Sequence, residues 1–128
     1  MTKPKRPLRR VIQTEKRLQQ LQDYLSMFDL IAFDCETTNP SGNGLGNDRW
    51  MIGFSVAVFD NDKWHGWYIP IRHTATQDLF YEPPDNIDPE RGLDFIRSLY
   101  GKTLIVHNVA FEYFTFHLDG IDQKAFDY

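Results

Sequence analysis

The chain has 128 residues, of which 41% are hydrophobic and 25% are charged, as expected for one globular domain. No apolar run approaches the roughly 20 residues of a membrane-spanning helix, and the basic N-terminus leads into a polar segment rather than an apolar signal sequence. The single cysteine, Cys35, excludes an internal disulfide and a cysteine-built zinc site. We therefore expect a protein of the cytoplasm, which is a reducing compartment.

The net charge of −4 is unevenly distributed along the chain. Residues 1–17 hold seven basic side chains and one acidic side chain, whereas the remaining residues hold seven basic and seventeen acidic ones. We therefore divide the chain into a basic N-terminal arm, residues 1–13, and a domain, residues 14–128. A basic arm on an acidic body predicts contact with a polyanion, and the alternative is a solvated tail that aids solubility.

The first half of the domain predicts a helix followed by three strands. A helical period begins near Thr14, and the apolar run at residues 30–33 is typical of a buried central strand. Residues 51–59 and 64–71 flank a turn at residues 60–62, which predicts a β-hairpin. The apolar positions of the predicted helix are Leu18, Leu21, Leu25 and Phe28.

The second half predicts a helix, a strand and a further helix. Asp88, followed by proline and an acidic residue, is typical of a helix start, and Gly101 is typical of its end. Residues 103–106 predict a second buried strand, after which Asn108 caps a third helix that continues to about residue 118. The residues expected on its core face are Phe111, Phe114 and Leu118. This order of elements predicts an α/β domain with a mixed sheet.

Two carboxylates, Asp34 and Glu36, follow the strand expected at residues 30–33. Residues i and i+2 of a strand share a face and lie about 6.6 Å apart along it, so the pair can bind a hard cation from one side. The alternative is that the strand has ended and both side chains point into solvent.

A third carboxylate, Glu112, lies one turn into the helix that Asn108 is expected to cap. If the strands at residues 30–33 and 103–106 are neighbours, Glu112 projects toward the acidic pair. Three converging carboxylates suit Mg²⁺ or Mn²⁺ rather than Zn²⁺. The alternative is a solvent-facing helical glutamate.

Other polar residues form no further motif. His107 follows a strand and is expected to have a structural role, and the other histidines lack the spacing of metal ligands. The glycines at positions 42, 44 and 46 are expected to form a flexible loop rather than a phosphate-binding loop, because no Gly-Lys-Ser/Thr sequence follows them. No serine or cysteine occurs in a nucleophile elbow.

Several segments together resemble a known family, the DEDD 3′–5′ exonucleases. Residues 30–38 (LIAFDCETT) resemble its first motif, most closely that of the proofreading domain of family-A, polymerase I-type DNA polymerases. Residues 51–55 resemble the second strand of that domain, and residues 68–73 resemble the Tyr-Ile-Pro-x-x-His sequence that ends its third strand. Residues 105–112 resemble its second motif, Asn-x-x-Phe/Tyr-Asp, and residues 125–127 resemble the Phe-Asp-Thr sequence that follows.

The resemblance implies a ribonuclease H-like α/β fold, truncated at its C-terminus, and two-metal hydrolysis of a terminal phosphodiester. It implies that Asp34, Glu36 and Glu112 are catalytic residues and ligands of two Mg²⁺ or Mn²⁺ ions. The substrate-binding residues that it implies are Thr37, Thr38 and Asn108.

Two features depart from the family pattern. Glu112 stands where the family has aspartate, and one extra methylene can displace a ligand by about 1 Å, which costs ~10²-fold in rate. The third motif should lie several dozen residues beyond Asp127, but the sequence ends at Tyr128. We therefore expect the fourth ligand, the water-orienting residue and the last strand to be missing here, either because the sequence is a fragment or because it is a natural short protein.

Three hypotheses of function follow. The leading one is a metal-dependent 3′–5′ exonuclease-type domain that acts on single-stranded DNA or DNA 3′ ends in the cytoplasm of a bacterium or phage-infected host, with an incomplete catalytic set. The alternative is a non-catalytic module, such as a phage-encoded one, that binds nucleic acid or a protein partner through the truncated fold. A third hypothesis is a small α/β interaction domain. A protein partner or a second copy is expected to cover the truncated edge.

Overall fold

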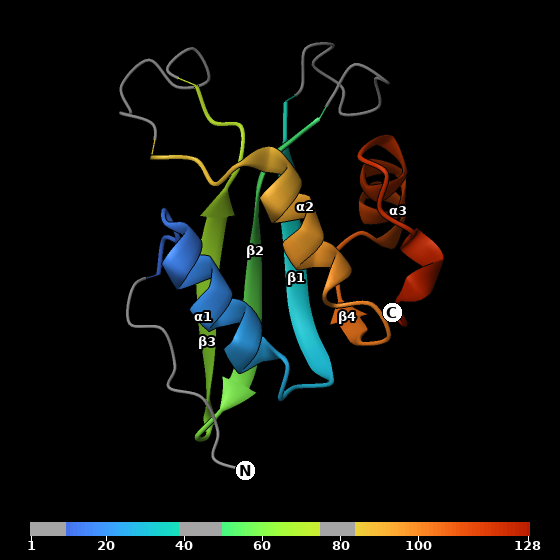
Figure 1. Ribbon diagram of the computed structural model, residues 1–128. Helices are drawn as coiled ribbons and strands as arrows, with labels where there is room; N and C mark the ends of the chain where they lie inside the picture. The colour runs from blue at the N-terminus through green and yellow to red at the C-terminus, as the bar shows by residue number, and fades with distance from the viewer. Residues whose placement is uncertain (1–9, 39–49, 75–83) are drawn as a thin grey trace.

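A computed structural model describes residues 10–38, 50–74 and 84–128, which form one mixed sheet flanked by helices (Figure 1). The sheet has the strand order β3-β2-β1-β4. Its strands are β1 (Leu30–Thr37), β2 (Met51–Asp60), β3 (Lys63–Pro70) and β4 (Thr103–Ile105), and the helices are α1 (Glu15–Leu25), α2 (Pro89–Arg97), α3 (Val109–Leu118) and the short 3₁₀ helix η2 (Gln123–Ala125). The expected α/β class is confirmed, and the arrangement is compatible with a ribonuclease H-like fold. Within the described part of the chain, no helix has both the length and the apolar character that crossing a bilayer requires.

The strand pairing confirms the expected hairpin and the expected parallel neighbours. β2 and β3 pair antiparallel around a turn in which Asn61 and Asp62 have positive φ angles of 51° and 62°. β1 pairs antiparallel with β2 and parallel with β4, the latter only over residues 30–32. From residue 33 onward, the edge of β1 opposite β2 therefore has no strand partner among the described residues.

β1 is longer than its apolar run suggests. It continues through Asp34, Cys35 and Glu36 to Thr37, because these residues pair with the beginning of β2. The acidic pair therefore lies within a strand rather than after one. Strand alternation places Cys35, which is 5% exposed, on the opposite face from its two exposed neighbours.

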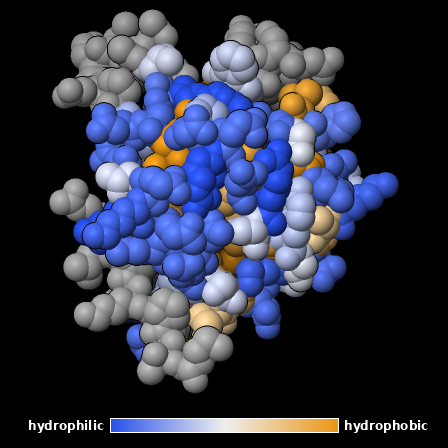
Figure 2. Space-filling model, in the orientation of Figure 1, coloured by the Kyte–Doolittle hydropathy of each residue, from blue (hydrophilic) through white to orange (hydrophobic). Residues whose placement is uncertain are grey.

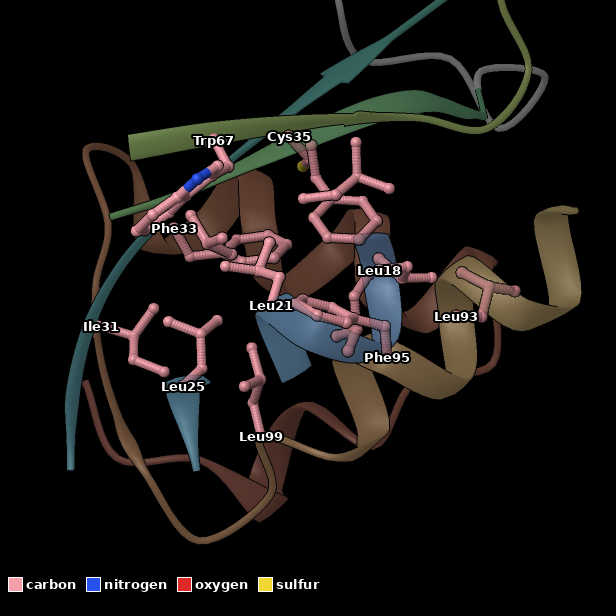
Figure 3. Packing of buried hydrophobic residues seen from close by; sticks show 14 of the residues in the cluster. Leu18, Leu21, Leu25, Ile31, Phe33, Cys35, Trp67, Leu93, Phe95 and Leu99 are labelled. Atoms are coloured by element: carbon pink, nitrogen blue, oxygen red, sulfur yellow. The ribbon is translucent and has the colours of Figure 1, made fainter. Parts of the chain in front are cut away.

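The core lies between the sheet and helices α1 and α2, which cover one sheet face (Figure 1). Figure 3 shows the leucines of α1 and the side chains of α2 meeting apolar residues of β1 and β3 there. The Thr14 hydroxyl caps α1 by accepting a hydrogen bond from the backbone N–H of Arg17. The outer surface of these helices is mostly hydrophilic (Figure 2). The largest fully buried side chains include Tyr24, Phe54, Phe95, Phe116, Leu18 and Leu21.

The segment before α1 extends the sheet at its β3 edge. The backbone N–H of Ile12 donates to the Tyr68 carbonyl at 2.9 Å, and the Tyr68 N–H donates to the Arg10 carbonyl at 2.8 Å. Ile12 is fully buried, so the residues that pack on the domain include part of the sequence assigned to the arm. The rest of the arm, residues 1–9, lies outside the described residues, as does the loop expected at residues 39–48.

The core face expected for α3 is only partly correct, because Phe111 packs against the core but is not fully buried. The structure buries Glu112, Thr115 and Phe116, whereas Phe114 and Leu118 are only half-buried. α3 lies beside β4 and the edge of β1 rather than on the sheet face that α1 and α2 cover (Figure 1). Since apolar residues occur on every side of α3, its neighbours in the fold decide which side is buried.

Candidate functional site

The position of α3 follows from contacts at both of its ends. At its start, the Asn108 side chain accepts a hydrogen bond from the Phe111 N–H at 3.1 Å, which confirms the predicted cap. At its end, Asp119 forms a 3.1 Å ion pair with Arg72, and Arg72 also donates to the Met51 carbonyl at 2.8 Å. The contacts of Asp119 and Arg72 connect the end of α3 to the beginning of β2 and the segment after β3.

Glu112 meets β1 where β4 no longer pairs with it. Its carboxylate accepts hydrogen bonds from the Cys35 thiol and the Cys35 backbone N–H, and it also interacts with the Asp34 carboxyl group. Because Glu112 approaches β1 from its unpaired edge, its side chain can contact both Cys35 and Asp34, although these two residues point to opposite faces of the sheet. Glu112 is 1% exposed, so the alternative of a solvent-facing glutamate is wrong.

The buried pair formed by Cys35 and Glu112 has perturbed acidities. Burial, together with the charge of Asp34, raises the pKa of Glu112 to about 7, although the hydrogen bonds from Cys35 oppose this shift. Burial and the neighbouring Glu112 carboxylate raise the pKa of the Cys35 thiol well above its ordinary value. The thiol is therefore protonated at neutral pH and acts as a hydrogen-bond donor.

Glu36 has a different set of contacts from Glu112. It shares the face of β1 with Asp34, as strand alternation predicts, and its Oε2 accepts a hydrogen bond from the Tyr68 hydroxyl at 3.0 Å. The Tyr68 hydroxyl also lies 2.5 Å from Nε2 of His73. These two residues belong to the segment at residues 68–73, for which the sequence predicts a strand end but no role in the site.

The predicted substrate-binding residues lie around these carboxylates and make local backbone contacts. Thr37 is half-buried at the end of β1, after a register shift that follows Glu36. The Thr38 hydroxyl accepts a hydrogen bond from the Trp50 N–H at 3.1 Å, which connects the ends of β1 and β2. Asn108 is exposed, and its side-chain oxygen is engaged at the start of α3.

The donor set fits one hard divalent ion better than it fits a preformed two-ion centre. Asp34 and Glu112 offer neighbouring carboxylates, and Mg²⁺ in proteins is often held by one or two carboxylates with waters completing its shell. The charge of Asp34 contributes to the raised pKa of Glu112, and a bound cation would relieve the same repulsion. Across the described ranges, no group of three Asp, Glu, His or Cys residues is arranged to hold a metal.

The sheet face opposite α1 and α2 carries a shallow hollow of about 440 Å³ beside Asp34. Small residues of the three neighbouring strands form its floor, among them Ala32, Ala57 and Gly66, and Tyr68 and Val11 lie at its side. The hollow is mainly apolar, and Asp34 places a carboxylate in its lining.

The histidines differ in their surroundings. His65 is 2% exposed, and its Nε2 lies 3.0 Å from the Asp60 carbonyl, so it has a structural role in the hairpin. His107, for which the sequence predicts a structural role, is exposed. His73 and Cys35 were not predicted as site residues. For Cys35 the signal was present, because a residue between two carboxylates on a strand must face the core.

Comparison with known proteins found no family model and no curated protein that matches this chain.

Proposed function

We propose that this chain is a metal-dependent 3′–5′ exonuclease-type domain for DNA 3′ ends, with an incomplete catalytic set, in the cytoplasm of a bacterium or phage-infected host. The observation that supports the proposal is the meeting of Asp34 and Glu112, which lie far apart in the sequence. The parallel pairing of β1 with β4 places the beginning of α3 beside the acidic strand. A cluster of carboxylates at such a strand suits the binding of a hard divalent ion and a phosphodiester.

In this proposal each carboxylate has a defined task. Asp34 and Glu112 bind one Mg²⁺ or Mn²⁺ ion. Glu36 is a further metal ligand, on the same face of β1 as Asp34. A divalent ion there would stabilise negative charge on the phosphoryl oxygens and lower the pKa of a water molecule. Cys35 orients the Glu112 carboxylate, which is one methylene longer than the aspartate of the family motif. The single strand would approach from the exposed side of Asp34 and Glu36.

Direct measurement of Mn²⁺ binding by calorimetry tests this proposal without requiring turnover. We expect Asp34→Asn and Glu112→Gln to weaken Mn²⁺ binding at least tenfold, while the unfolding midpoint of Asp34→Asn stays near that of the parent chain. Asp62→Asn is the matched control, because Asp62 is an exposed carboxylate in the hairpin turn, which lies at the opposite end of the sheet (Figure 1). Absence of binding to the parent chain, or equal affinity in Asp34→Asn, would overturn the proposal.

A second candidate function is supported by the hollow on the sheet face. A non-catalytic module would use this apolar surface, with Ala57 near its centre, to bind a protein partner or a second copy of the chain. Sedimentation velocity over a concentration series distinguishes the two functions. Self-association that Ala57→Glu abolishes, together with Mn²⁺ binding that Asp34→Asn does not change, would favour the module.

A further inference from the structure

The Tyr68 side chain crosses a whole strand to reach Glu36. Tyr68 on β3 pairs with Ser55 on β2, whereas Glu36 on β1 pairs with Gly53, so the two residues are diagonal neighbours across β2. Since adjacent strands lie about 4.8 Å apart, β3 and β1 are separated by about 10 Å. The phenol ring spans this gap and places its hydroxyl 3.0 Å from Oε2 of Glu36.

Gly53 provides the space for this crossing. A Cβ atom at position 53 would overlap the Tyr68 hydroxyl and lie 2.5 Å from Cζ of the ring. The glycines with positive φ angles in the described residues are Gly101 and Gly120, so Gly53 is not needed for its backbone conformation. The absence of a side chain at this position therefore has a steric purpose, which is to let the Tyr68 ring lie across β2.

His73 holds the other side of the Tyr68 hydroxyl. A carboxylate can only accept, so the hydroxyl donates to Glu36 and its oxygen accepts from Nε2 of His73 at 2.5 Å. His73 is itself held through its backbone by Asn86. The His73 N–H donates to Oδ1 of Asn86 at 2.9 Å, and Nδ2 of Asn86 donates to the His73 carbonyl at 3.0 Å. A continuous hydrogen-bonded chain therefore leads from the segment before α2 to the acidic strand.

We propose that Tyr68 is a positioning residue that fixes the Glu36 carboxylate for divalent-ion binding, and that His73 and Gly53 in turn fix Tyr68. This inference rests on the proposed function, because it gives a purpose to Glu36 as a ligand. An exposed glutamate must lose rotamer freedom when it binds an ion, and a hydrogen bond made in advance reduces that loss. Partners of this kind behind a metal ligand are typically worth about 10–100-fold in metal affinity or activity.

The first test measures Mn²⁺ affinity by calorimetry in the full chain and in Tyr68→Phe, which removes only the hydroxyl. We expect Tyr68→Phe to lower the Mn²⁺ affinity roughly tenfold or more. Its urea midpoint should change no more than that of the control variant. The control is Tyr24→Phe, since the Tyr24 hydroxyl also donates to a carboxylate, that of Asp60, but at the far end of β2. Glu36→Gln should weaken binding at least as much as Tyr68→Phe.

The second test examines the supporting residues. His73→Gln retains an amide donor and should keep most of the affinity, whereas His73→Ala should resemble Tyr68→Phe. Gly53→Ala should also lower the affinity, and the double variant Gly53→Ala/Tyr68→Phe should lose no more than the larger single loss, because both changes break the same contact.

The outcomes separate this inference from the proposed function. Mn²⁺ binding that Asp34→Asn abolishes and Tyr68→Phe leaves unchanged would overturn the positioning role while the exonuclease proposal stands. If Glu36→Gln has no effect on affinity, Glu36 is not a ligand and the positioning role is also overturned. Absence of Mn²⁺ binding to the parent chain would overturn both.

Discussion

The Cys35 thiol donates a hydrogen bond to the Glu112 carboxylate, although the two residues are 77 positions apart in the sequence. The contact joins the middle of β1 to the first turns of α3, at the point where β4 stops pairing with β1. Glu112 is thus both part of the packing between these elements and a neighbour of the exposed Asp34. The pKa of Glu112 therefore depends on how α3 packs against β1.

Stability should depend on pH through Glu112. Its folded-state pKa of about 7 lies above the ordinary value of 4.5, so below pH 4.5 the stabilising effect of its proton is fully present. As pH rises from 4.5 to about 7, the folded state keeps a proton that the unfolded state has lost, and stability falls by up to about 1.4 kcal/mol per pH unit. Glu112→Gln removes this contribution, so the urea midpoint of the variant should rise relative to that of the parent chain between about pH 5 and 7. Parallel midpoint curves for the two proteins would contradict the prediction.

The Cys35 thiol should stabilise the fold through Glu112 rather than through its volume alone. Cys35→Ala leaves the buried carboxylate with one donor fewer, which should cost about 1–3 kcal/mol in unfolding free energy. Cys35→Ser, which retains a donor, should lose less. In a double-mutant cycle with Glu112→Gln, we expect a coupling of at least about 0.5 kcal/mol, and additivity within that margin would show that the two side chains act independently.

The isolated chain should hydrolyse single-stranded DNA poorly or not at all in Mg²⁺ or Mn²⁺. The described residues contain no group of three metal-ligating side chains, so the site lacks the ligands that two-metal hydrolysis needs. The assay follows shortening of a 5′-labelled single strand, with Asp34→Ala as the control for contaminating nuclease. Robust hydrolysis that Asp34→Ala abolishes would show that a second copy or other residues complete the site.

The basic arm should supply most of the salt dependence of single-strand binding, because the body of the protein is acidic. Each phosphate contact contributes about −0.7 to the slope of log K against log salt, so engagement of the seven basic residues at positions 1–17 would give roughly −5, and half of them about −2 to −3. Deletion of residues 1–9 removes four of these seven basic residues, so it should remove about half of this slope and leave the unfolding midpoint intact. The deletion ends before Arg10, because the Arg10 carbonyl accepts a hydrogen bond from Tyr68. Equal slopes for the two chains would indicate a solvated tail.

Local patterns predicted those elements whose signals are contained within a few residues. The apolar period that begins near Thr14 predicts α1, and the structure buries Leu18, Leu21 and Leu25 as expected. The composition on either side of residues 60–62 predicts the hairpin. The Asp88 cap predicted for α2 is present, but the helix ends at Arg97, with Ser98 as its C-cap, rather than at Gly101. Each of these depends on backbone preferences or on one apolar face, and both can be read locally.

The orientation of α3 could not be predicted in this way. Its sequence is apolar on several sides, so Phe111, Phe114 and Leu118 formed as plausible a core stripe as the residues that are buried. Glu112 is buried because α3 lies along the edge of β1, where the Cys35 thiol and backbone N–H satisfy its carboxylate. A polar side chain is buried only where a hydrogen-bond partner is available, and the partner of Glu112 is Cys35, which is distant in the sequence.

The sequence by itself determined the α/β class and the caps at Asp88 and Asn108, because these follow from periods and short-range hydrogen bonds, whereas the extension of β1 through Asp34 and Glu36 depends on its pairing with β2. Only the tertiary structure decided what those carboxylates touch. The contact between Tyr68 and Glu36 depends on the registers of two strand pairings and on the empty space at Gly53. Register is set by packing and turns across the whole sheet, so no local pattern contains it.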